Sequence, residues 1–82
     1  MTLSLQPVRI RTESSDEEGR LVMAEGFLVA ILIQLSADHG TEAGYWFLEV
    51  GFGNLGHPRP APFPDLPAAL DWITTQAGRR SG

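Results

Sequence analysis

Residues 20–36 read RLVMAEGFLVAILIQLS, and this stretch decides the fold of the chain. After Gly26 both alternating sets of side chains are apolar, and three β-branched residues among them favour a β-strand. We predict one long strand here, with a bend or a bulge near Glu25 and Gly26 because the stretch is much longer than a usual strand. A helix over residues 27–36 is the alternative, because apolar residues also recur there at helical spacing, namely Phe27, Leu28, Ile31, Leu32 and Leu35.

Two further strands and one helix are predicted on either side of this stretch. Leu3–Thr12 and Tyr45–Phe52 both alternate as half-buried strands do. Five prolines between positions 58 and 67 make a connector that is too poor in backbone donors for a sheet interior. A helix follows, with Asp65 as its N-cap and Gly78 at its end. We therefore expect an α+β fold, in which a three-stranded antiparallel β-meander with a long, bent central strand carries one C-terminal α-helix on one face.

The composition describes one small acidic domain of 82 residues, which we place at residues 1–78 with a frayed tail at 79–82. The chain has ten carboxylate and six cationic side chains, which gives a formal net charge of −4. All six cations are arginine, which we interpret as the codon bias of a GC-rich bacterial genome. The absence of cysteine excludes thiol nucleophiles, zinc ribbons and iron–sulfur clusters. Neither a secretory signal nor a membrane-length apolar run is visible, so we expect a cytoplasmic protein that does not associate with membranes.

Three patterns resemble functional motifs but fit structural roles better. Gly51–Gly56 has the G-x-G-x-x-G spacing of dinucleotide-binding loops, but no helix follows it, so we expect no cofactor. The two histidines, His39 and His57, are accompanied by Asp38 and Glu42 in a turn and not on a helix face, so we expect no metal site. Residues 13–19 hold four carboxylates without the alternating ligands of a calcium loop, and we predict a solvated turn there.

Charged residues support two alternative functions. Glu25 and Glu49 each interrupt an apolar alternation, and a carboxylate pair across a sheet can act as acid and base, so a small-ligand-binding domain or weak enzyme using them is one alternative. Water would reach both residues, however, and we assign no catalytic residue. Arg9 and Arg11 project from one side of a strand, which makes a nucleic-acid accessory protein the second alternative. An acidic chain repels phosphate, so we do not expect nucleic acid as a partner.

The leading prediction comes from the number of apolar side chains. The chain has 26 large apolar residues besides Met1, and one short helix covers only one face of a sheet. We expect the helix to cover Trp46, Leu48, Val50 and Phe52 together with Phe27, Val29, Ile31 and Ile33. An uncovered apolar cluster would then remain on the other face, formed by Leu28, Ala30, Leu32, Tyr45 and Phe47. We therefore predict a non-catalytic interaction or structural module that forms a homodimer, or binds another protein, through this face or through an exposed strand edge.

Overall fold

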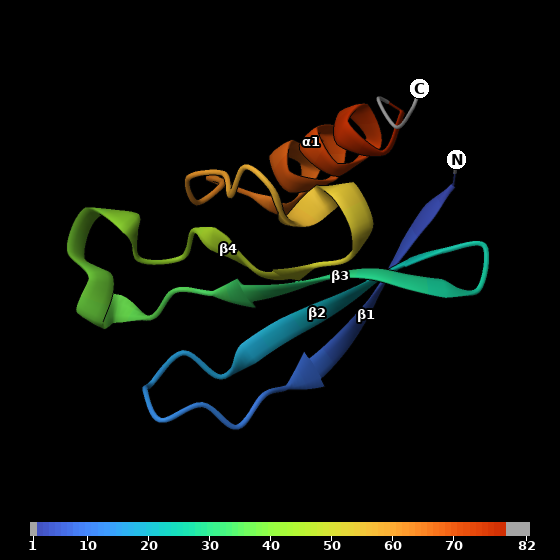
Figure 1. Cartoon of the computed structure of the whole chain (residues 1–82). Coiled ribbons are helices and arrows are strands. Elements are labelled where there is room, and N and C mark those ends of the chain that lie inside the picture. Colours follow the sequence, from blue (N-terminus) through green and yellow to red (C-terminus); the bar gives the residue numbers. More distant parts are fainter. Residues whose placement is uncertain (1, 79–82) are drawn as a thin grey trace.

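Four antiparallel strands and one C-terminal helix make up the part of the chain that the computed structural model describes, residues 2–78 (Figure 1). The strands follow one another in the sheet in sequence order: β1 (Leu3–Arg9), β2 (Glu18–Ala24), β3 (Phe27–Gln34) and β4 (Trp46–Gly51). Two short 3₁₀ helices, η1 (Ala37–Glu42) and η2 (Gly53–Gly56), flank β4. Helix α1 (Leu66–Gly78) lies on one face of the sheet with η2 beside it. The predicted α+β class with an antiparallel sheet and a C-terminal helix is confirmed.

The predicted long central strand is in fact two strands, so the sheet has four strands and not three. Glu25 and Gly26 alone connect β2 to β3, and both have positive φ, 53° and 89°. Positive φ at both central residues defines the two-residue turn whose twist matches a β-hairpin. The predicted bend at these residues is therefore a complete reversal of the chain. The prediction of extended structure after Gly26 is confirmed, and the helix alternative is wrong.

One face of the sheet packs against α1 and forms the main core. In register, Val22 pairs with Ala30 and Leu32 pairs with Leu48, so these four side chains point to the same side. The helix contributes Ile73, which is completely buried. The buried members of this core are Val22, Ala30, Leu32, Trp46, Leu48, Leu55, Phe63, Ala69 and Ile73. We call this side of the sheet the covered face.

The predicted assignment of β3 side chains to the two faces is wrong from Ala30 to Ile33, although it holds for Leu28 and Val29. Ala30 and Leu32, expected on the uncovered face, are completely buried on the covered face, and Ile31 and Ile33 point the other way. The reason is the register: β3 and β4 shift by one residue between Ile31 and Leu32, and β2 and β3 shift at a second irregularity. Each shift changes which residues share a face, so alternation within one strand does not predict the alignment of its neighbour.

The start of α1 follows the prediction. The Asp65 carboxylate accepts a hydrogen bond of 2.9 Å from the Ala68 backbone N–H, which is the N-cap interaction expected of this residue. Trp72 lies against Phe63, with ring centroids 5.8 Å apart. Asn54 of η2 donates a 2.8 Å hydrogen bond to the backbone carbonyl of Gln76. Both ends of the helix are thereby tied to the connector that follows β4.

The glycines of the G-x-G-x-x-G segment have packing and turn roles. A Cβ on Gly51 would lie 2.7 Å from the backbone of Leu55, and a Cβ on Gly56 would lie 2.9 Å from the carbonyl oxygen of Gly51. Gly53 has a φ of 62°, a conformation that side-chain-bearing residues rarely adopt. The spacing is therefore explained by the close approach of η2 to the end of β4.

We expect the substitution Gly51→Ala to lower the free energy of unfolding by about 1–3 kcal/mol, because the new methyl group meets backbone that cannot move aside. Gly78→Ala is the matched control, since a Cβ there has no neighbour within 4 Å. Urea denaturation of the two variants measures the difference. Equal stabilities would show that η2 does not pack on Gly51 as described.

Candidate functional site

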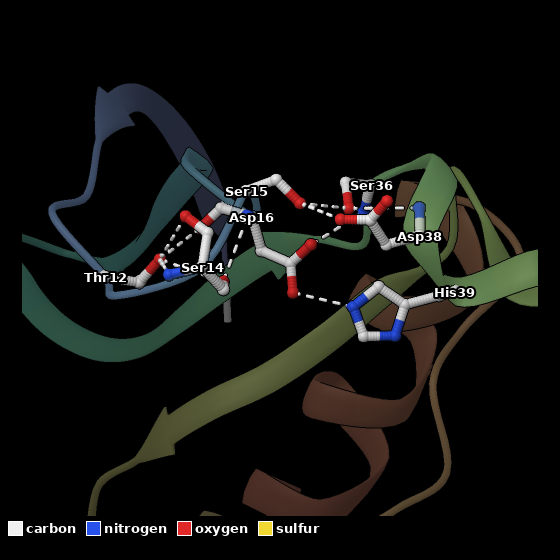
Figure 2. Close-up of polar contacts among 7 residues, drawn as sticks. All are labelled: Thr12, Ser14, Ser15, Asp16, Ser36, Asp38 and His39. Atoms are coloured by element: carbon white, nitrogen blue, oxygen red, sulfur yellow. Dashed lines mark hydrogen bonds and ion pairs between the residues drawn. The ribbon is translucent and has the colours of Figure 1, made fainter.

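The loop between β1 and β2, residues 10–17, meets η1 at one end of the sheet (Figure 1). Asp16 is the centre of this contact (Figure 2). One of its carboxylate oxygens accepts a 2.8 Å hydrogen bond from the Ser36 backbone N–H, and the other lies 2.8 Å from Nε2 of His39. The Asp16 side chain is only 13% exposed, although its neighbours in the loop are open to solvent. The predicted solvated turn thus contains one carboxylate that is bound by the rest of the fold.

A second set of contacts runs beside the first. Ser15 Oγ donates a 2.7 Å hydrogen bond to the Asp38 carboxylate and lies 2.7 Å from the Ser36 hydroxyl. Ser36 caps η1, because its Oγ accepts a hydrogen bond from the Asp38 backbone N–H at 3.3 Å. Within the loop, Thr12 Oγ1 donates to the Asp16 carbonyl at 3.0 Å and shapes the turn. The loop therefore docks on η1 through side chains that lie about 20 positions apart in the sequence.

The environment of Asp16 favours its charged form. Partial burial raises the pKa of the Asp16 carboxyl, but hydrogen bonds from the Ser36 backbone, from His39 and from the Ser36 hydroxyl, together with the nearby His39 ring, outweigh it. The net result is a pKa below the ordinary value of an aspartate. The docked loop is accordingly most stable when Asp16 is ionised.

A cavity of about 290 Å³ opens beside this network. Its apolar side is formed by Ile33, Leu35, Phe47 and Pro62, and its polar side by Asp16, His39, Glu42 and Glu49. Serine and histidine are bonded to different carboxylates here, Ser15 to Asp38 and His39 to Asp16, which differs from the serine–histidine contact of a nucleophile and its base. Residues 2–78 hold no group of three or more metal-ligating side chains placed to bind an ion.

Glu25 and Glu49, the carboxylates predicted to act together, occupy different parts of the molecule. Glu25 lies in the β2–β3 turn and is exposed. Glu49 lies in β4 and lines the cavity with Asp16 and His39, near the β1–β2 loop. The turn and this loop are at opposite ends of the sheet (Figure 1). The structure therefore places Glu49 beside the histidine and not beside Glu25.

Three of the arginines, including Arg9 of the nucleic-acid alternative, lie in different parts of the sheet. Arg9 forms a 2.6 Å ion pair with Glu17 near the β1 edge of the sheet. Arg59 lies beside β4 at the other edge, where it donates to the Leu48 carbonyl and stacks over the Phe47 ring at 5.3 Å. Arg20 pairs with Glu18 at 2.6 Å and stacks over the Trp46 ring at 5.0 Å. Residues 79–82, the predicted frayed tail, lie outside the described part of the chain.

The second feature of the molecule is the face of the sheet turned away from α1, which we call the open face. Its side chains follow from the register and form three rows across the strands: Val8, Gly19, Ile33 and Phe47; Gln6, Leu21, Ile31 and Val50; Ser4, Met23 and Leu28. Apart from Gln6, Ser4 and Gly19 every member is apolar. Ile33 is buried, with 3% exposure, whereas most of the others are half-buried and Leu28 is 38% exposed.

Two members of the predicted interface, Leu28 and Phe47, belong to the open face, and Tyr45 is half-buried just before β4. Ala30 and Leu32 belong to the main core and cannot reach a partner. The sequence analysis did not include Leu21 and Met23, and its assignment of Val50 to the helix-covered face is wrong, because the register brings all three together on the open face. Their alternation along β2 and β4 was visible, but the two irregularities in pairing were not. An uncovered apolar face exists, with a different composition from the predicted one.

Comparisons with protein-family models, with curated proteins and with solved structures found no match for this chain. Between residues 2 and 78 no helix is long and apolar enough to cross a membrane. The functional assignment therefore depends on the two features above, the docked loop with its cavity and the open face.

We expect Asp16→Asn to lower the free energy of unfolding at pH 7 by about 1–2 kcal/mol, because it removes a charged acceptor from Ser36 and His39. Because the pKa of Asp16 is lowered on folding, its contribution is complete above the unfolded-state value of about 3.9 and is lost as the pH falls through the folded-state value. The variant should therefore lose less stability than the wild type between pH 5 and pH 2.

Denaturant titrations at several pH values measure this difference. Glu13→Gln is the matched control, because Glu13 lies in the same loop, is exposed and makes no side-chain hydrogen bond within residues 2–78. Its stability should stay within about 0.5 kcal/mol of the wild type. Identical pH profiles for the two variants would contradict the role assigned to Asp16.

Proposed function

We propose that this protein is a non-catalytic interaction module that forms a homodimer by packing the open faces of two copies together. The observation that carries the proposal is the apolar surface formed mainly by half-buried residues of β2, β3 and β4, with Val8 of β1 at its margin. Monomeric proteins rarely leave such a surface in water. Packing of two sheets face to face is a common way to bury it, and an isologous contact needs only one kind of surface.

The β4 edge of the sheet does not offer an alternative contact. The connector after η2 runs beside this strand, and Phe63 exchanges two backbone hydrogen bonds with Trp46, at 2.7 and 2.8 Å. Arg59 occupies further carbonyl groups of the same strand. A covered edge cannot pair with a second sheet.

The β1 edge is protected in another way. The Ile10 backbone N–H donates to the Glu17 carbonyl across the hairpin at 2.8 Å, so even-numbered residues of β1 direct their N–H groups towards β2. Odd-numbered residues, including Pro7, therefore direct theirs towards the free edge. Since Pro7 has no N–H, it interrupts the row of donors that a second strand would need. These contacts thus favour the open face over either strand edge.

The size of the open face sets the expected affinity. Four strands spaced about 4.8 Å apart and about seven residues long span roughly 20 by 23 Å, a footprint on the order of 450 Å² per copy. Two copies then bury about 900 Å², which is below the roughly 1,200 Å² of accessible surface at which specific, stable interfaces start. We therefore expect a reversible dimer with a dissociation constant in the micromolar range, and not an obligate one.

Sedimentation equilibrium between about 1 and 500 μM tests the proposal, with the wild type expected to change from monomer to dimer over this range. Leu21→Glu should weaken the dimer at least tenfold, because it places a carboxylate at the centre of the open face. Phe27→Glu is the matched control. Phe27 is 74% exposed, but it pairs with Ala24 and so projects from the covered side.

Circular dichroism and urea denaturation establish that both variants are folded. Equal weakening by both substitutions would place the contact elsewhere than on the open face. A wild type that stays monomeric at 500 μM would refute the homodimer.

A further inference from the structure

The β1–β2 loop is held to the rest of the molecule by side chains. Ile10 N–H to the Glu17 carbonyl is the last backbone hydrogen bond of the hairpin ladder before the loop. Asp16 and Ser15 make the bonds to η1, and most of the groups involved are exposed to solvent. A segment anchored by a few exposed hydrogen bonds opens at a low free-energy cost compared with the sheet beneath it.

This loop closes one end of the open face. The Ile10 side chain lies directly over Gly19, since a Cβ on Gly19 would fall only 2.4 Å from Ile10 Cδ1. Gly19 is the cross-strand neighbour of Ile33, which is 3% exposed although α1 lies on the other side of the sheet. Asp16 lines the cavity that borders Ile33 and Leu35. Ile33 and Leu35 are therefore buried at the loop end, where Asp16 of the loop lines their cavity together with Phe47 and Pro62, whereas Leu21 and Met23 farther along are half-buried.

We propose that residues 10–17 form a releasable strap that limits self-association by shielding one end of the open face. This proposal rests on the homodimer proposed above. Release of the strap from η1 exposes Ile33 and Leu35 and lengthens the apolar surface that a second copy can cover. The docked strap keeps this end of the surface out of the contact.

Ser15 is the position at which the strap can be released with the smallest change. Its hydroxyl donates to the Asp38 carboxylate, so Ser15→Glu places a second carboxylate against the first, and like charges repel. Ser15→Gln is the matched control. The glutamine side chain has nearly the same size and shape as glutamate, but its amide N–H can still donate to Asp38.

Hydrogen exchange of the Ser36 amide reports directly on the strap, because this N–H is bonded to Asp16. We expect Ser15→Glu to accelerate exchange of this amide at least tenfold while the amides of β2 and β3 keep the wild-type rate. Sedimentation should show a dimer about tenfold tighter, which corresponds to about 1.4 kcal/mol. Ser15→Gln should match the wild type in both measurements.

Unchanged Ser36 exchange in Ser15→Glu would overturn the strap, and so would faster exchange with an unchanged or weaker dimer. A monomeric wild type would refute the homodimer but not the release of the strap. Release can then be measured with a soluble paramagnetic agent, which broadens the signals of solvent-exposed methyl groups. Release would broaden the methyl signals of Ile33 and Leu35 more strongly in Ser15→Glu than in Ser15→Gln. Equal broadening in the two variants would contradict it.

Discussion

The two-residue turn at Glu25 and Gly26 is the constraint on which the rest of the structure depends. It converts one apolar stretch into the two central strands of the sheet and sets their pairing next to the turn. The irregularity between Val22 and Met23 sets the pairing farther along. A shift of one residue would exchange the two faces of β3, because side chains alternate along a strand. The register observed places Ala30 and Leu32 under α1 and leaves Ile31 and Ile33 on the other side.

The same arrangement produces a sheet that is apolar on both faces, although residues 2–78 contain a single α-helix to cover them. The covered face contains the completely buried side chains, and the open face contains half-buried ones. Covering of the β4 edge by the proline-rich connector and interruption of the β1 edge by Pro7 prevent the sheet from growing sideways. Apolar contact through the open face is the interaction that this architecture favours.

Much of the fold is predictable from the sequence, because the decisive signals are local. Asp65 predicts the start of α1, and the alternation of aromatic residues predicts β4. The alignment of neighbouring strands is not local, since it depends on pairing irregularities at Met23 and Leu32 that have no signature in the sequence. The docking of Asp16 on Ser36 is equally non-local, and a run of carboxylates by itself predicts only a solvated turn.

The most direct test of the central claim is an isotope-filtered nuclear Overhauser experiment on a mixture of labelled and unlabelled protein at a concentration where the dimer forms. The account predicts intermolecular contacts from the methyl groups of Leu21, Met23, Ile31 and Val50, the side chains of the open face. Intermolecular contacts confined to α1, or to the outer edge of β1, would contradict it.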